Sequence, residues 1–167
     1  MIRNTIDSEK TNFIVLGEPG CGKSECIATL LNRSPSFSQT VIPSYEHFTM
    51  LRMNELVEVA LYEANFGNAG FLLNAEIIDF DFLMSLAVLV VVPYDKDGWD
   101  YTRLSAILDK LRGWYASIYG RLTAAQKSEL EKRFARVNGS NTNPDAEHHI
   151  PTVLVLHRYD LFLKDAM

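Results

Sequence analysis

The sequence predicts an α/β fold in which helices flank a mostly parallel central sheet. Apolar segments typical of strands alternate along the chain with segments of helical periodicity. The segment Leu86–Val92 is apolar at every position, as in a parallel strand that is buried on both faces. The chain has 167 residues, 47% of them hydrophobic, which is enough for one substantial core. We therefore expect a single domain over residues 1–167.

The first elements are predicted to be a strand and a helix separated by a glycine-rich loop. Residues Phe13–Leu16 form a short apolar run that ends at Gly17. The segment Glu25–Asn32 then carries its apolar residues at helical spacing. The segment Arg33–Ser44 is rich in Ser and Pro and is expected to be a surface loop. About 11 residues before the first strand are expected to be flexible, as chain ends often are.

Two strands joined by a tight turn are predicted next. Residues His47–Met53 and Leu56–Tyr62 fit strands, with the turn at residues 54–55. The segment Glu63–Gly70 is rich in Asn and Gly and is predicted to be a loop. The segment Phe71–Ser85 is ambiguous, although the spacing of Leu72, Leu73, Glu76 and Ile77 suggests a helix.

The second half of the chain is predicted to add two helices and a last strand. The segment Tyr101–Tyr119 is amphipathic, with apolar residues three and four positions apart. A second, more polar helix follows Thr123, and Gln126 stands three residues later, as in a capping box. A polar surface loop over residues 138–149 then leads to the final strand, Thr152–Leu156.

Charge and hydropathy argue against several functional classes. The net charge of −5 is unlike that of proteins that bind nucleic acid through a basic surface. No apolar run approaches the roughly 20 residues that cross a bilayer, so membrane insertion is not expected. The chain lacks a basic start followed by an apolar run, and its two cysteines do not make a disulfide framework. We therefore expect a cytoplasmic protein.

One motif carries specific chemistry. Residues Gly17–Ser24 match the phosphate-loop pattern G-x-x-x-x-G-K-[ST], with a strand before them and a helix after them. The glycines allow main-chain amides to turn toward phosphate oxygens. Lys23 is expected to reach the terminal phosphates, and the Ser24 hydroxyl to hold Mg²⁺. The candidate phosphate-binding residues are Gly17, Gly20, Cys21, Gly22, Lys23, Ser24 and Glu25.

Two further residues are candidates for Mg²⁺ binding and hydrolysis. In Ras-like GTPases a Thr in the loop after the first helix contacts the γ-phosphate and Mg²⁺; Thr40 has a comparable place, and Thr49 fits less well. The D-x-x-G pattern of those proteins has no match in register. Glu63 stands there instead, and it either holds Mg²⁺ through water or is a solvated loop charge. Because no Gln follows to position an attacking water, efficient hydrolysis is not expected.

The last strand is followed by a candidate base-binding segment. Guanine specificity in the same superfamily comes from N-K-x-D, and this chain has His157-Arg158-Tyr159-Asp160 at that place. Asp160 would accept hydrogen bonds from the base, and the planar guanidinium of Arg158 would stack on it. The alternative is that Asp160 is the N-cap of a helix.

Together these features resemble the Ras-like domain of dynein light intermediate chains, above all those of cytoplasmic dynein 2. The matching stretches are Gly17–Ser24, Tyr62-Glu63, Asp97-Gly98-Trp99, Ile150-Pro151 and Arg158–Phe162. The resemblance implies a three-layer P-loop (Ras-like) fold that binds GTP or GDP with Mg²⁺. It also implies a weakly hydrolytic or non-hydrolytic scaffold that docks on the dynein heavy chain beside other motor subunits, in the cytoplasm, cytoskeleton and cilium.

Some alternatives stay open at this point. The chain could instead be an active small GTPase switch or, as a third reading, a phosphotransferase such as a nucleoside kinase. The chain stops at Met167, and the closing strand and helix of such a fold are expected to be missing. Cys21 is either a reactive thiol near a helix N-terminus or a small loop residue. Trp114 and Tyr115 are expected inside the core, and Trp99 on a contact surface.

Overall fold

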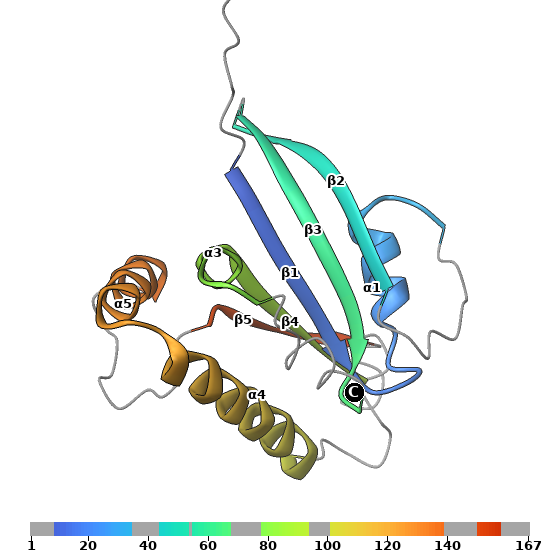
Figure 1. The fold of residues 1–167 in the computed structure, drawn as a ribbon. Helices are drawn as coiled ribbons and strands as arrows, with labels where there is room; N and C mark the ends of the chain where they lie inside the picture. Colours follow the sequence, from blue (N-terminus) through green and yellow to red (C-terminus); the bar gives the residue numbers. More distant parts are fainter. Residues whose placement is uncertain are drawn as a thin grey trace, which may run out of the picture.

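A computed structural model of the chain describes residues 9–34, 44–53, 55–67, 78–93, 101–138 and 150–157. In these residues five strands form one mixed sheet, and four helices accompany it (Figure 1). The strands are β1 (Glu9–Gly17), β2 (Ser44–Arg52), β3 (Glu55–Asn65), β4 (Leu86–Pro93) and β5 (Thr152–His157). The helices are α1 (Lys23–Leu30), α3 (Phe80–Met84), α4 (Tyr101–Arg121) and α5 (Ala124–Asn138).

The sheet has the strand order β2-β3-β1-β4-β5. Strand β1 pairs in parallel with β3 on one side and with β4 on the other, and β5 is parallel to β4. Only the pairing of β2 with β3 is antiparallel, because a short turn joins these two strands. The predicted α/β class and the mostly parallel sheet are confirmed.

Helices lie on both faces of this sheet. Ile14 and Leu16 of β1 belong to one buried cluster, which includes residues of α4 and α5. Val15 points the other way and packs with Ile27 of α1. This division follows from the strand geometry, in which successive side chains point to opposite faces. Figure 1 shows α1 on one side of the sheet and α4 on the other.

The helices α4 and α5 enter the larger cluster through apolar residues. Trp114 and Tyr115 of α4 are buried, as predicted, and so are Leu130 and Phe134 of α5. The predicted capping box before α5 is also present. The Gln126 main-chain N–H donates to Thr123 Oγ1 at 3.3 Å, and the Thr123 N–H donates to Gln126 Oε1 at 3.0 Å.

Two predictions about loops are wrong in part. Strand β3 continues to Asn65, although the sequence predicts a loop from Glu63. Strand β1 begins at Glu9, inside the segment predicted to be flexible. In both places parallel pairing keeps polar residues extended: Glu9 lies opposite Val57, and Asn65 lies opposite Gly17. The apolar pattern marked only the middle of each strand.

Smaller differences concern the ends of elements. The first helix spans Lys23–Leu30 rather than Glu25–Asn32, and β3 already begins at Glu55. Helix α3 lies within the segment that the sequence left ambiguous. No helix in the described part of the chain is both long enough and apolar enough to cross a bilayer.

Candidate functional site

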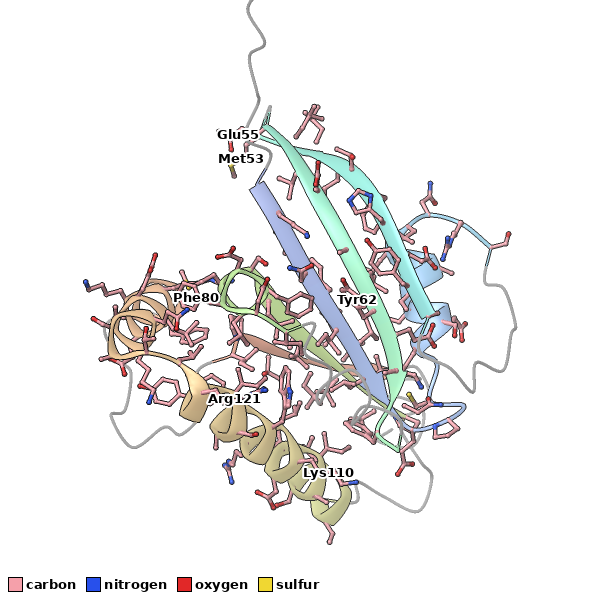
Figure 2. The ribbon with its side chains drawn as sticks, viewed as in Figure 1. Met53, Glu55, Tyr62, Phe80, Lys110 and Arg121 are labelled. Carbon is pink, nitrogen blue, oxygen red and sulfur yellow. The ribbon has the colours of Figure 1, made fainter. Side chains whose placement is uncertain are left out.

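The glycine-rich loop lies at the carboxyl end of β1, in the middle of the sheet. From β1 the chain goes first to β2 and β3 on one side, and later to β4 and β5 on the other. In open α/β sheets ligands bind at the carboxyl ends of the strands where the order reverses in this way. Figure 2 labels Met53 and Glu55 at the opposite end of the sheet, so the loop and the β2–β3 hairpin turn lie far apart.

Three glycines give the loop its shape. Gly20 has a φ of 77° and Gly22 a φ of 91°, which L side chains rarely adopt. Gly22 is also the N-cap of α1. Gly17 is needed for a different reason: a Cβ there would lie 2.3 Å from Cys21 Sγ and 2.7 Å from the main-chain oxygen of Val91. The loop therefore folds tightly over the ends of β1 and β4.

The ammonium of Lys23 is buried in this loop. The residue is 5% exposed, although it carries a charge. Its Nζ donates to the Glu18 carbonyl oxygen at 2.8 Å and to the Gly17 carbonyl oxygen at 3.4 Å. It also donates to Asn65 Oδ1 at 2.7 Å. These acceptors offset the free energy that burying a charge costs.

Ser24 and Glu63 are brought together by the tertiary structure. The Ser24 hydroxyl donates to Glu63 Oε1 at 2.8 Å, across 39 positions of sequence. Glu63 is 8% exposed and lies within β3, so it is not the solvated loop charge that the sequence left open. Its second oxygen lies 3.4 Å from the Ser44 hydroxyl. Two of the three residues proposed for Mg²⁺, Ser24 and Glu63, are thus in contact at the edge of the loop.

Tyr62 and Glu63, the pair quoted for the family resemblance, point to opposite faces of the sheet. The Tyr62 ring lies 5.6 Å from that of Phe82, on the side of α3, and 5.0 Å from that of Tyr45 (Figure 2 labels Tyr62). Tyr62 is therefore half-buried against the larger cluster, and of this pair only Glu63 contacts the loop.

Cys21 is a buried packing residue of the loop. It is 1% exposed and lies in the cluster formed with Val15 and Ile27. Burial raises the pKa of its thiol, and the nearby ammonium of Lys23 only partly opposes this rise. The alternative of a reactive thiol with a lowered pKa is therefore wrong.

Glu25, the last of the candidate phosphate-binding residues, is exposed in the first turn of α1.

Three contacts of the site were not predicted from the sequence. They are the bond from Lys23 to Asn65, the bond from Ser44 to Glu63, and the bond from the Phe66 N–H to the Gly17 carbonyl oxygen at 3.3 Å. The sequence did contain a pattern that could have predicted that Glu63 and Asn65 face the loop. The alternation that runs through Leu61 continues to Glu63 and Asn65, which places both on the face that α1 covers.

The other predicted site residues lie outside the described residues. These are Thr40, Arg158 and Asp160, together with the contact candidate Trp99. In the part of the chain that the structure describes, no group of three or more His, Cys, Asp and Glu side chains is arranged to hold a metal. No protein-family model matches the chain, and no curated protein matches its sequence.

Proposed function

We propose that this protein binds a guanine nucleotide with Mg²⁺ in the loop Gly17–Ser24 and hydrolyses it weakly or not at all. One observation supports this above the others. The buried ammonium of Lys23 and the Ser24–Glu63 pair meet at the carboxyl end of β1, in a loop shaped by left-handed glycines. A three-layer P-loop (Ras-like) fold is part of the same proposal, and the strand order and the helices on both faces support it.

The loop offers the groups that an anionic phosphate chain needs. Helix α1 begins at Lys23, and the first N–H groups of any helix have no acceptor within it. Such N–H groups and the positive end of the helix dipole favour a phosphate. Gly20 and Gly22 bring the main chain close without side chains in the way. Lys23 adds a full positive charge beside them.

The residues present also suit Mg²⁺, which prefers oxygen ligands and keeps several of its waters. Ser24 would supply a hydroxyl oxygen, and Glu63 a carboxylate oxygen directly or through water. The phosphates and water would supply the rest, so the protein needs no cluster of carboxylates. Bound there, Mg²⁺ would neutralise the charge of the phosphates and fix their orientation.

Weak hydrolysis is inferred from what surrounds Glu63. Its two carboxylate oxygens lie within hydrogen-bond distance of Ser24 and Ser44, which holds them at the loop. The segment that follows, from Ala64 to Gly70, contains no Gln to orient a water. The competing proposal is an active GTPase switch. Single-turnover GTP hydrolysis at the rate of ordinary Ras-like proteins would favour the switch.

The decisive experiment measures nucleotide affinity after bound nucleotide has been removed. Fluorescent GDP, GTP and ATP are titrated with Mg²⁺ and again with EDTA. We expect micromolar or tighter binding of the guanine nucleotides and weaker binding without Mg²⁺. The preference for guanine rests on Asp160 and Arg158 in the sequence, so equal affinity for ATP would contradict that part alone.

The matched variants are Lys23→Ala and Lys110→Ala. Loss of a charge-assisted contact costs about 1.5–3 kcal/mol, so Lys23→Ala should weaken binding by about 10- to 100-fold. Lys110 is exposed on α4 (Figure 2), and its loss should leave affinity unchanged. A circular-dichroism melt shows whether each variant is folded. A folded Lys23→Ala protein with wild-type affinity would contradict the proposal.

The wider role that we propose is that of a scaffold subunit in a dynein motor for intraflagellar transport. This part is supported by the resemblance of the motifs alone. It predicts that the purified protein binds a recombinant tail fragment of the dynein 2 heavy chain and is enriched in cilia. Absence of binding at micromolar concentrations by analytical ultracentrifugation would contradict it, whatever the outcome of the nucleotide titrations.

A further inference from the structure

Among the described residues outside the loop, Asn65 alone has a side chain bonded to the Lys23 ammonium. It is the last residue of β3 and lies in parallel register with Gly17, the first residue of the phosphate loop. Its Oδ1 accepts from Lys23 Nζ at 2.7 Å, across 42 positions of sequence. An ammonium can only donate, so the carboxamide oxygen and not its nitrogen must face it.

This contact completes the hydrogen bonding of the ammonium. A lysine ammonium has three N–H donors. Three oxygens surround it here: Asn65 Oδ1 at 2.7 Å, the Glu18 carbonyl at 2.8 Å and the Gly17 carbonyl at 3.4 Å. Cys21 Sγ lies farther away, at 3.9 Å, and as a weak acceptor it can only share a donor with one of these oxygens. A phosphate oxygen that binds Lys23 must therefore displace one of these acceptors.

The first displacement costs little. The Gly17 carbonyl oxygen is the most distant of the three oxygens, and it also accepts the Phe66 N–H at 3.3 Å. When a β-phosphate oxygen takes its place at Lys23, the Gly17 oxygen keeps a hydrogen bond. A diphosphate needs only this one exchange.

A second displacement costs more. A lysine that bridges the β- and γ-phosphates uses two donors, so the γ-phosphate must break one of the two short bonds, to Glu18 or to Asn65. We propose that Asn65 makes the site prefer a nucleoside diphosphate over a triphosphate, because its carboxamide oxygen competes with the γ-phosphate for a donor of Lys23. This inference rests on the proposed function of the loop as a nucleotide site.

Two substitutions at the same position test it in opposite directions. Asn65→Leu keeps the approximate size but removes the acceptor, which frees one donor of Lys23. The triphosphate then displaces only the weak Gly17 bond. Since one net hydrogen bond changes an equilibrium by about fivefold to tenfold, the ratio of triphosphate to diphosphate affinity should rise by about that factor. Asn65→Asp replaces the neutral acceptor by a charged one and should lower the same ratio.

The measurement is isothermal titration of nucleotide-free protein with GDP and with a non-hydrolysable GTP analogue, both with Mg²⁺. Thr11→Val, which lies on β1 six residues before the loop, serves as the control and should not change the ratio. A loss of structure around the loop would weaken both ligands in both variants. If Asn65 had only a structural role, the ratio of triphosphate to diphosphate affinity would therefore not shift in opposite directions in the two variants.

The outcomes separate the inference from the proposal on which it rests. Tighter binding of GDP by the wild type, with opposite shifts in the two variants, supports the inference. Wild-type protein that binds the triphosphate more tightly, or an Asn65→Leu protein with an unchanged ratio, overturns the inference and leaves nucleotide binding intact. Wild-type protein that binds neither ligand overturns the proposed function and the inference together.

Discussion

Individual residues of the glycine-rich loop Gly17–Ser24 are constrained by contacts that a substitution cannot avoid. At Gly20 and Gly22 the constraint is the left-handed main chain, and at Gly17 it is the space beside it. Lys23 is constrained by charge, because a buried ammonium needs its acceptors. The sequence motif names these residues, and the structure adds the reason for each.

The first prediction concerns Gly17. The added methyl of Gly17→Ala would meet Cys21 Sγ, which can shift, and the main-chain oxygen of Val91, which belongs to the sheet. The loop must therefore move. We expect the free energy of unfolding in urea to fall by about 1–3 kcal/mol, as for other overpacked sites, and nucleotide binding to weaken.

Gly113→Ala is the matched control for this substitution. Gly113 lies within α4, and a Cβ there would meet no atom within 4 Å. Replacing a helical glycine in open space should raise the free energy of unfolding by about 0.5–1 kcal/mol. If the Gly17→Ala protein were as stable as the Gly113→Ala protein, the main-chain oxygen of Val91 could not lie as close to Gly17 as the structure shows.

The helices and strands differ in how well the nearby sequence predicts where they begin and end. The buried strand β4 and the start of α5 were predicted closely, because one is apolar throughout and the other has a local capping box. The carboxyl end of β3 was not predicted, since Glu63 and Asn65 have low strand propensity. They are extended because they pair with Val15 and Gly17.

The second prediction concerns the start of α5. Thr123→Ala removes the hydroxyl that accepts the Gln126 N–H, and the loss of such a cap costs about 0.5–2 kcal/mol. The midpoint of thermal unfolding should fall accordingly. Ser128→Ala, at an exposed position within the same helix, should leave the midpoint unchanged or raise it slightly. Equal effects of the two substitutions would contradict the role of the capping box.

At the scale of the molecule, the helices α4 and α5 share one core with the sheet, and Tyr115 lies in it. The residue is 5% exposed, and its ring lies 6.4 Å from that of Phe134 and 5.5 Å from that of Tyr119. Burial raises the pKa of Tyr115 well above its ordinary value of 10.0, and the neighbouring Tyr119 and Glu131 add to the rise.

The third prediction follows from this shift. Below pH 10 the Tyr115 phenol is neutral in both states, and its contribution to stability is fully present. Above pH 10 it ionises in the unfolded chain but not in the folded protein, so the free energy of unfolding falls by at most about 1.4 kcal/mol per pH unit. Urea unfolding between pH 8 and 11 measures this slope.

Tyr115→Phe removes this phenol and should make the fall above pH 10 less steep. Some slope should remain, because burial also raises the pKa of Tyr62, and the hydrogen bond to Glu131 raises that of Tyr119. A slope identical to that of the wild type would show that Tyr115 ionises as readily in the folded protein as in the unfolded chain.

The sequence by itself determined the local parts of this protein. Those are the order of strands and helices, the glycine loop with its lysine, and the capping box, because each depends on residues only a few positions apart. Only the tertiary structure determined which residues of β3 contact the glycine-rich loop. Glu63 meets Ser24, and Asn65 meets Lys23, only because β1 and β3 pair in parallel in one register. A shift of that register by one residue would turn both side chains to the opposite face of the sheet.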